Sequence, residues 1–461
     1  MEKRAELTFK ISYLLLTLIS FNVFFARQWF VTYLSYAIVI VGLALGVMRL
    51  LHFRDYLNAG VFLLLFFTLS YVLGSINTYQ YGIVDNIKAV IWMLVQYFLL
   101  FAFDKNRDYS NERDIIFKVL LLYVSCCSMI SMILMAKKWQ YETVVDDIYL
   151  IRGGFIHNRL FGCYTDPNYG AVLSVVAIII AVFFIVTLKN SEKHGKTLRI
   201  VLFVLLSVSI ILNFLYICYS GSRTGMMSAA ASVIVILTGL FARKSGKIKT
   251  FVIVTVSAVL IVGMLYVLRN VTSNLEVEIA KSNAISSEAS EYEINRQMDL
   301  ARIGKAGPED DPGYDFFSGR LRIWKNAVEI FSQHPLLGIS FRNVYEYATV
   351  NIPTTFARFE SMHNAFFDIL VSQGILGVLL ISAFFVWALK ALIDKNKSLV
   401  RHFEYDVMLA VAVAVLVSTI TYSEVFYMNT GGAFVFWYSL GYLINLKEQG
   451  ENTDSIEKKE I

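Results

Sequence analysis

A succession of apolar runs, each about twenty residues long, is the feature that most constrains this chain. A run of that length crosses the roughly 30 Å hydrocarbon core of a bilayer as a helix. The composition agrees, because 57% of the residues are hydrophobic and 17% are charged, whereas about a quarter of the residues in soluble domains are charged. We therefore expect an all-α polytopic membrane protein with about twelve transmembrane helices. The expected spans lie near residues 11–26, 30–48, 57–74, 87–103, 115–136, 168–188, 198–218, 225–241, 250–268, 364–388, 405–422 and 432–446.

The positive charge of the chain is unevenly distributed between the connections. Lys and Arg concentrate in 189–199, 242–249 and 388–402. The positive-inside rule predicts that these connections and both termini are cytoplasmic. The resulting organisation is transmembrane helices one to nine in 1–268, a large extracytoplasmic loop in 269–363, transmembrane helices ten to twelve in 364–446 and a cytoplasmic tail in 447–461.

The end of the large loop carries a helical pattern. In residues 318–333 apolar side chains recur at helical spacing, Ser318 is suited to cap the helix, and the His334-Pro335 pair ends it. The result is an amphipathic helix, and Trp324 suits a place at the membrane interface. Packing of this helix on neighbouring spans is the alternative.

Charged residues on the predicted extracytoplasmic side stand close to the starts of predicted helices. Such starts present unpaired N–H groups and the positive end of the helix dipole, and glycine lets an anion approach the backbone. If these starts converge, they form a phosphate or diphosphate site. The residues concerned are Asp166 in TDPN (165–168), Arg223 in SGSRTG (220–225), Arg320 in SGR (318–320) and His363 in HN (363–364).

Simpler interpretations apply to several of these residues. An arginine at a membrane boundary often reaches toward lipid headgroups, and Asp166 is suited to cap a helix. The sequence contains no recognisable metal motif. A net charge of +5 gives no reason to expect nucleic acid as a partner. Ionisable residues are sparse within the spans, which disfavours ion-coupled transport.

Four motifs follow one another around the large loop: RLFGCYTDPNYGA (159–171), SGSRTG (220–225), SGRLRIWKNAVEIFSQHPLLGIS (318–340) and MHNAFFDILVSQGILG (362–377). With the layout of spans, their order resembles the O-antigen ligase and polymerase superfamily of membrane glycosyltransferases. The resemblance implies a GT-C-like fold and a reaction without metal or cofactor at the outer face of the bacterial inner (plasma) membrane. It also implies an undecaprenyl-diphosphate-linked oligosaccharide as substrate, with chain-length regulator and flippase proteins as candidate partners.

The resemblance also implies roles for individual residues. It gives Arg159, Arg223, Arg320 and Arg322 as diphosphate-binding residues, and His363, Arg223 and Arg320 as catalytic residues. His363 would act as general base or hold the acceptor sugar, and the arginines would stabilise the charge that develops on the leaving diphosphate. Asp166 and Glu360 are the candidate carboxylates on the acceptor side.

Polymerase and ligase use the same donor and differ in acceptor, and no motif in the sequence separates them. We favour a repeat-unit polymerase for O-antigen or capsule, because the earlier outer loop and the large loop both carry arginines, which suits two lipid diphosphates. Ligase-type transfer to another cell-surface acceptor is the first alternative. A lipid-linked glycan flippase or another transporter is the second, and the few polar residues in the spans disfavour it.

Overall fold

The computed structural model describes most of the chain. The described residues are 2–26, 28–145, 149–156, 159–189, 195–242, 248–249, 252–261, 263–264, 266–267, 320–352, 361–398 and 402–446.

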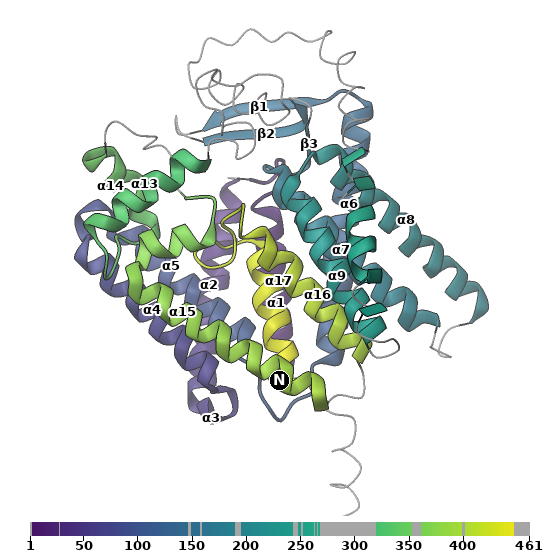
Figure 1. The fold of residues 1–461 in the computed structure, drawn as a ribbon, viewed down its shortest axis with the longest axis horizontal. Coiled ribbons are helices and arrows are strands. Elements are labelled where there is room, and N and C mark those ends of the chain that lie inside the picture. Colours follow the sequence, from purple (N-terminus) through teal and green to yellow (C-terminus); the bar gives the residue numbers. More distant parts are fainter. Residues whose placement is uncertain are drawn as a thin grey trace, which may run out of the picture.

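Helices dominate the described residues (Figure 1). They are α1 (Glu2–Ile19), α2 (Trp29–Leu51), α3 (Phe53–Tyr56), α4 (Ala59–Asn77), α5 (Ile83–Val95), α6 (Ser110–Ala136), α7 (Pro167–Lys189), α8 (Lys196–Ser220), α9 (Arg223–Ala242), α13 (Arg320–Gln333), α14 (Val344–Asn351), α15 (Ala365–Ser398), α16 (His402–Ser418) and α17 (Gly431–Ile444). A π-helical turn, Gln96–Phe101, extends α5, and short 3₁₀ turns lie at Tyr79–Tyr81 and Phe341–Asn343.

Eight of the described helices are long and apolar enough to cross a membrane, which supports a multi-pass membrane protein. They lie at Trp29–Leu51, Ala59–Asn77, Ile83–Phe101, Ser110–Ala136, Pro167–Lys189, Lys196–Ser220, Arg223–Phe241 and Ala365–Lys397. Gly431–Ile444 and Val252–Ile261 are apolar but shorter. Twelve spans, the GT-C-like fold and the domain boundaries therefore stay predictions.

A small antiparallel sheet, which the sequence did not predict, lies across one end of the bundle (Figure 1). Its strands are β1 (Gln140–Val145), β2 (Tyr149–Ile156) and β3 (Arg159–Gly162), in the order β1-β2-β3. We call this end of the bundle the sheet end. Helices α13 and α14 lie toward the same end, whereas the N-terminus lies at the opposite end.

A buried cluster of ion pairs joins α1, α2 and α6 at the end opposite the sheet. Lys10 Nζ lies 2.6 Å from Glu112 Oε1, and Arg107 Nη2 lies 2.7 Å from Glu112 Oε2. Glu6 pairs with Arg49 and with Arg107. Burying a charge is costly unless it is paired, so these contacts fix the three helices relative to one another.

Helix α15 is broken at Gly374, where φ is +60°. The connection that follows α13 fills this break. The carbonyls of α15 before the break accept hydrogen bonds from Ile339 N and Ser340 N, each at 2.9 Å. Two N–H groups after the break donate to Pro335 O at 2.9 Å and Leu336 O at 3.4 Å. Because no water can bond backbone groups in an apolar environment, this pairing allows the helix to break there.

Side chains tie the same connection to α4. The hydroxyls of Ser75 and Ser340 lie 2.7 Å apart, and Thr78 Oγ1 donates to Ile339 O at 2.8 Å. Asn343 Nδ2 donates to Thr78 O at 2.9 Å. The chain that leaves α13 is therefore held between α4 and α15, which fixes the place of α13 at the sheet end.

We predict that Gly374→Ala destabilises the protein by about 1–3 kcal/mol, because an L-residue is strained at this positive φ. A Cβ at this position would also lie 2.5 Å from the backbone of Pro335 and Leu336. Thermal unfolding in detergent measures the effect. Gly46→Ala is the matched control, because a Cβ there meets nothing within 4 Å. Equal melting temperatures for the two variants would contradict the prediction.

Candidate functional site

The SGSRTG turn joins α8 to α9 at the sheet end. Helix α8 ends at Ser220, and Gly221 follows in the left-handed conformation with φ +60°. The hydroxyl of Ser222 accepts a hydrogen bond from Gly225 N at 3.0 Å, which caps α9. Arg223 is the first residue of α9 and is half-buried. The turn therefore places an arginine at the positive end of a helix dipole.

Arg159 on β3 connects this turn to the start of α7. Its Nε donates to Ser220 O and its Nη2 donates to Asn168 Oδ1, both at 3.0 Å. The hydroxyl of Ser222 donates to the same Asn168 oxygen at 2.9 Å. The Arg159 side chain is buried. A single amide oxygen thus joins the sheet, α7 and the α8–α9 turn.

Asp166 caps α7. Its Oδ1 accepts hydrogen bonds from the backbone N of Asn168 at 2.6 Å and of Tyr169 at 3.3 Å. The starts of α7 and α9 pack closely, because a Cβ at Gly225 would lie 2.6 Å from the Cβ of Ala171. Two helix N-termini and two arginines therefore gather in one place, an arrangement that attracts anions.

A second group of predicted residues lies where α13 meets α15. Trp324 Nε1 donates to the backbone carbonyl of Met362 at 3.1 Å, and its ring stacks on Phe367 with centroids 5.3 Å apart. Arg320 stands four residues before Trp324 and shares its face of α13. His363 follows Met362 directly. Helix α13, which carries Arg320, is thus bonded to the turn that carries His363.

The two groups meet at residues 419–421, the first three residues of the connection between α16 and α17, which we call the bridging segment. The hydroxyl of its last residue lies 2.6 Å from Thr224 Oγ1 in the first turn of α9. Its first two carbonyls accept hydrogen bonds from Ala365 N and from Asn364 Nδ2, each at 2.9 Å. The start of α9 and the start of α15 are therefore bonded to the same short segment.

Arg223 and His363 each precede a residue that is bonded to the bridging segment. Arg159 and Asp166 belong to the Arg223 side, and Arg320 belongs to the His363 side. Two predicted residues remain. Arg322 lies in α13, but its side chain is outside the described part, and Glu360 lies outside the described residues.

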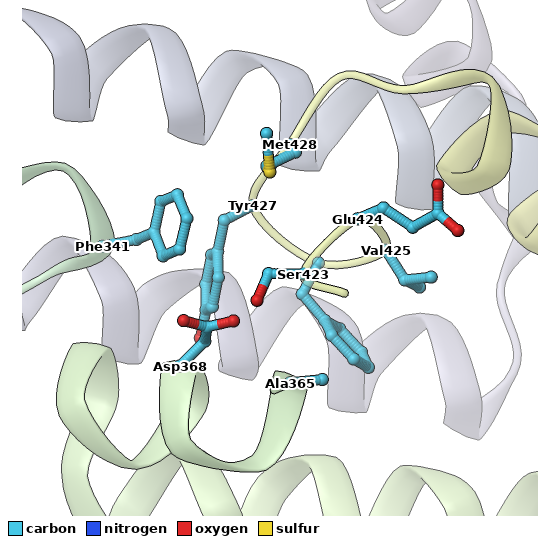
Figure 2. A pocket seen from close by; sticks show the side chains of 9 residues that line it. Phe341, Ala365, Asp368, Ser423, Glu424, Val425, Tyr427 and Met428 are labelled. Carbon is cyan, nitrogen blue, oxygen red and sulfur yellow. The ribbon is translucent and has the colours of Figure 1, made fainter. Parts of the chain in front are cut away.

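A small cavity is lined by residues of α15 and of the connection that follows the bridging segment, and two acidic residues not predicted from the sequence are among them (Figure 2). Asp368 is 3% exposed and Glu424 is 1% exposed. The lining residues are Phe341, Ala365, Asp368, Ser423, Glu424, Val425, Phe426, Tyr427 and Met428.

Glu424 is held against the start of α17. Its Oε1 accepts a hydrogen bond from Ser418 Oγ at 2.7 Å, and a Cβ at Gly432 would lie 2.4 Å from its Oε2. Burial raises the pKa of Glu424 to about 8, the Ser418 bond lowers it, and the nearby Asp166 carboxylate raises it. A polar run between two apolar helices, YSEVFYMNTGG (422–432), was the sequence signal for this residue.

The described residues contain no group of three or more His, Cys, Asp or Glu side chains that could hold a metal ion. Metal independence of the reaction stays a prediction. The chemistry that the described side chains offer is therefore arginine and helix-terminus contacts for an anion, together with a histidine and carboxylates that can exchange protons.

Residues 208–382 match the O-antigen ligase family (Wzy_C). This match covers less than half of the chain and supports its similarity to the O-antigen ligase and polymerase superfamily. The superfamily resemblance is thereby confirmed, and with it a membrane enzyme of the glycosyltransferase-like kind. The matched segment contains Arg223, Arg320 and His363, whereas Arg159 and Asp166 precede it. No curated protein matches the chain.

We predict that Glu424→Gln makes stability less dependent on pH. Glu424 lies in the connection between α16 and α17, outside the membrane-crossing helices. Because its pKa is raised from 4.5 to about 8, its contribution to stability is fully present below the unfolded pKa and is lost as the pH rises through about 8. The glutamine variant cannot ionise.

The melting temperature of Glu424→Gln minus that of the wild type should therefore increase by a few degrees between pH 5 and pH 8. Glu329→Gln, which changes an exposed carboxyl on α13, is the control and should give no such trend. A temperature difference for Glu424→Gln that is constant across this range would contradict the prediction.

Proposed function

We propose that this protein is a polysaccharide repeat-unit polymerase for O-antigen or capsule. It transfers glycan from an undecaprenyl-diphosphate-linked donor to the sugar of a lipid-linked acceptor, without metal, at the outer face of the bacterial inner membrane. The observation that supports this most directly is the bridging segment, to which the helix starts beside Arg223 and His363 are both bonded.

The reaction breaks the bond between the anomeric carbon and the diphosphate oxygen, and negative charge develops on the leaving diphosphate. Arg223, at the N-terminus of α9, supplies a permanent positive charge and a planar pair of donors for that group. Arg159 adds a second positive charge, and its bonds to Ser220 and Asn168 hold it beside the α8–α9 turn. Helix N–H groups and arginines then stabilise the negative charge of the leaving group, as a metal ion does in other transferases.

The acceptor hydroxyl attacks the anomeric carbon and must lose its proton. His363 takes this proton in our proposal, because an imidazole titrates near neutral pH. The new bond joins the acceptor oxygen to the anomeric carbon, and the undecaprenyl diphosphate leaves. Asp166 is committed to capping α7 through Oδ1, which favours His363 over Asp166 as the proton acceptor.

Arg320 is the second catalytic arginine of the proposal, with Arg322 as its neighbour. Because α13 is bonded to the turn that carries His363, Arg320 is suited to hold a diphosphate on the histidine side. A polymerase binds two lipid diphosphates, and two arginine groups on either side of the bridging segment match that requirement. Ligase-type transfer is the second candidate, and the description of the matching family as O-antigen ligase favours it.

Purified protein in detergent or liposomes would be incubated with undecaprenyl-diphosphate-linked repeat units, with and without EDTA, and products would be separated by length. A ladder of products that persists in EDTA supports the polymerase. One transfer to an added core acceptor, without a ladder, supports the ligase. Movement of the lipid-linked substrate across the bilayer without any new glycosidic bond would contradict both and support a transporter.

We predict that Arg223→Ala, Arg320→Ala and His363→Ala each lower kcat by about 100-fold or more, because each removes an interaction made in the transition state. The rate of ladder formation at saturating donor measures the effect. Lys88→Ala, which changes an exposed cation on α5, is the control and should keep wild-type activity. Full activity in the Arg223 and His363 variants would exclude the proposed site.

A further inference from the structure

The backbone of His363 adopts an unusual conformation. Its φ is +49°, in the left-handed region. Within the described part of the chain, the other non-glycine residues with positive φ are Lys138 and Ser340. Such a conformation costs energy for a residue with a Cβ, and it persists only where neighbouring groups hold it. Contacts with neighbouring residues must therefore stabilise this conformation of His363.

Both polar backbone groups of the preceding residue, Met362, are bonded to side chains. Its N–H donates to Asp368 Oδ1 at 2.7 Å, and its carbonyl accepts from Trp324 Nε1 at 3.1 Å. On the other side of His363, the side chain of Asn364 caps α15 by accepting from Phe366 N at 2.9 Å. The histidine thus sits between two residues whose backbone or side chain is fixed.

Asp368 is a buried carboxylate close to the turn that carries His363. It is buried, and Figure 2 places its carboxylate beside Ser423 and the ring of Tyr427. The Tyr427 ring in turn stacks on Phe341, with centroids 5.1 Å apart. Burying a carboxylate in such surroundings costs free energy. The hydrogen bond that this carboxylate accepts from Met362 N fixes the backbone just before His363.

We propose that Asp368 and Trp324 are positioning residues that set the orientation of His363 for proton transfer. This inference rests on the proposed function, in which His363 accepts the proton of the acceptor hydroxyl. Neither residue needs to touch the substrate. Asp368 fixes the turn from α15, and Trp324 fixes it from α13.

The geometry has a consequence for Arg320. Arg320 and Trp324 share a face of α13, one helical turn apart, and Trp324 is bonded to the turn of His363. Helix α13 therefore positions both Arg320, which binds a diphosphate in our proposal, and His363, which acts as the base. A displacement of about 1 Å in such an arrangement costs up to about 100-fold in rate.

The test uses Asp368→Asn, Asp368→Ala and Trp324→Phe in the full-length protein. Asparagine keeps an oxygen acceptor for Met362 N, whereas alanine removes it. Phenylalanine keeps the stacking on Phe367 and removes the indole N–H donor. We expect kcat to fall by about 10-fold or more in Asp368→Ala and several-fold in Trp324→Phe, with KM for the donor within about threefold of the wild type. Asp368→Asn should keep at least about a third of the wild-type kcat.

A second readout does not depend on activity. Diethyl pyrocarbonate labelling of His363, followed by peptide mass spectrometry, would be compared with labelling of His52, which is exposed and lies between α2 and α3. The labelling rate of His363 should rise about threefold or more in Asp368→Ala, because the turn is released, and should stay unchanged in Asp368→Asn. Asp85→Ala and Asp85→Asn, at an exposed carboxyl on α5, are the matched controls.

Two outcomes would overturn the inference. The first is Asp368→Ala with wild-type kcat or with unchanged labelling of His363. The second is Asp368→Asn that loses as much activity as Asp368→Ala while its labelling stays normal, because the negative charge itself would then act in the reaction. If Asp368→Ala does not fold, the kcat values of Asp368→Asn and Trp324→Phe test the inference in its place. A wild-type protein that forms no glycosidic bond would refute the proposed function instead, and the labelling would still test the positioning.

Discussion

Backbone groups that leave a helix in an apolar environment must find partners inside the protein, and in this chain those partners build the candidate site. The break in α15 at Gly374 is filled by the connection 335–340, which fixes α13. The carbonyls of the bridging segment, 419–421, accept from the start of α15, and its last hydroxyl meets the start of α9. The positions of three helices, α9, α13 and α15, thus follow from a requirement for hydrogen-bond partners.

Two kinds of chemistry lie on either side of the bridging segment. One side of the bridging segment gathers positive charge, with two arginines and the N-termini of α7 and α9. The other side holds a histidine in a backbone conformation that costs energy, and the residue before it, Met362, is bonded to Trp324 of α13. Leaving-group stabilisation and proton transfer are the two requirements of glycosyl transfer from a diphosphate. The match of residues 208–382 to the O-antigen ligase family agrees with that division.

Short-range signals in the sequence predicted the helix start at Arg223 and the cap at Asp166, because both depend on residues within three positions. The sheet was missed because β2 (YLIRGGFI) and β3 (RLFG) lack the regular alternation of apolar and polar residues that identifies a strand. Asp368 and Glu424 were missed because their burial depends on segments far apart in the chain. The bridging segment acts largely through backbone carbonyls, which leave no pattern in the sequence.

The most direct test of this account is a disulfide cross-link between α9 and the bridging segment. Thr224→Cys and Thr421→Cys would be introduced together after the four native cysteines, Cys126, Cys127, Cys163 and Cys218, are replaced by serine. Because the two threonine hydroxyls lie 2.6 Å apart, we expect mild oxidation to join the two cysteines in nearly every molecule, as read by mass spectrometry of the linked peptides. A folded double variant that forms no cross-link would contradict the claim that Arg223 and His363 flank one segment.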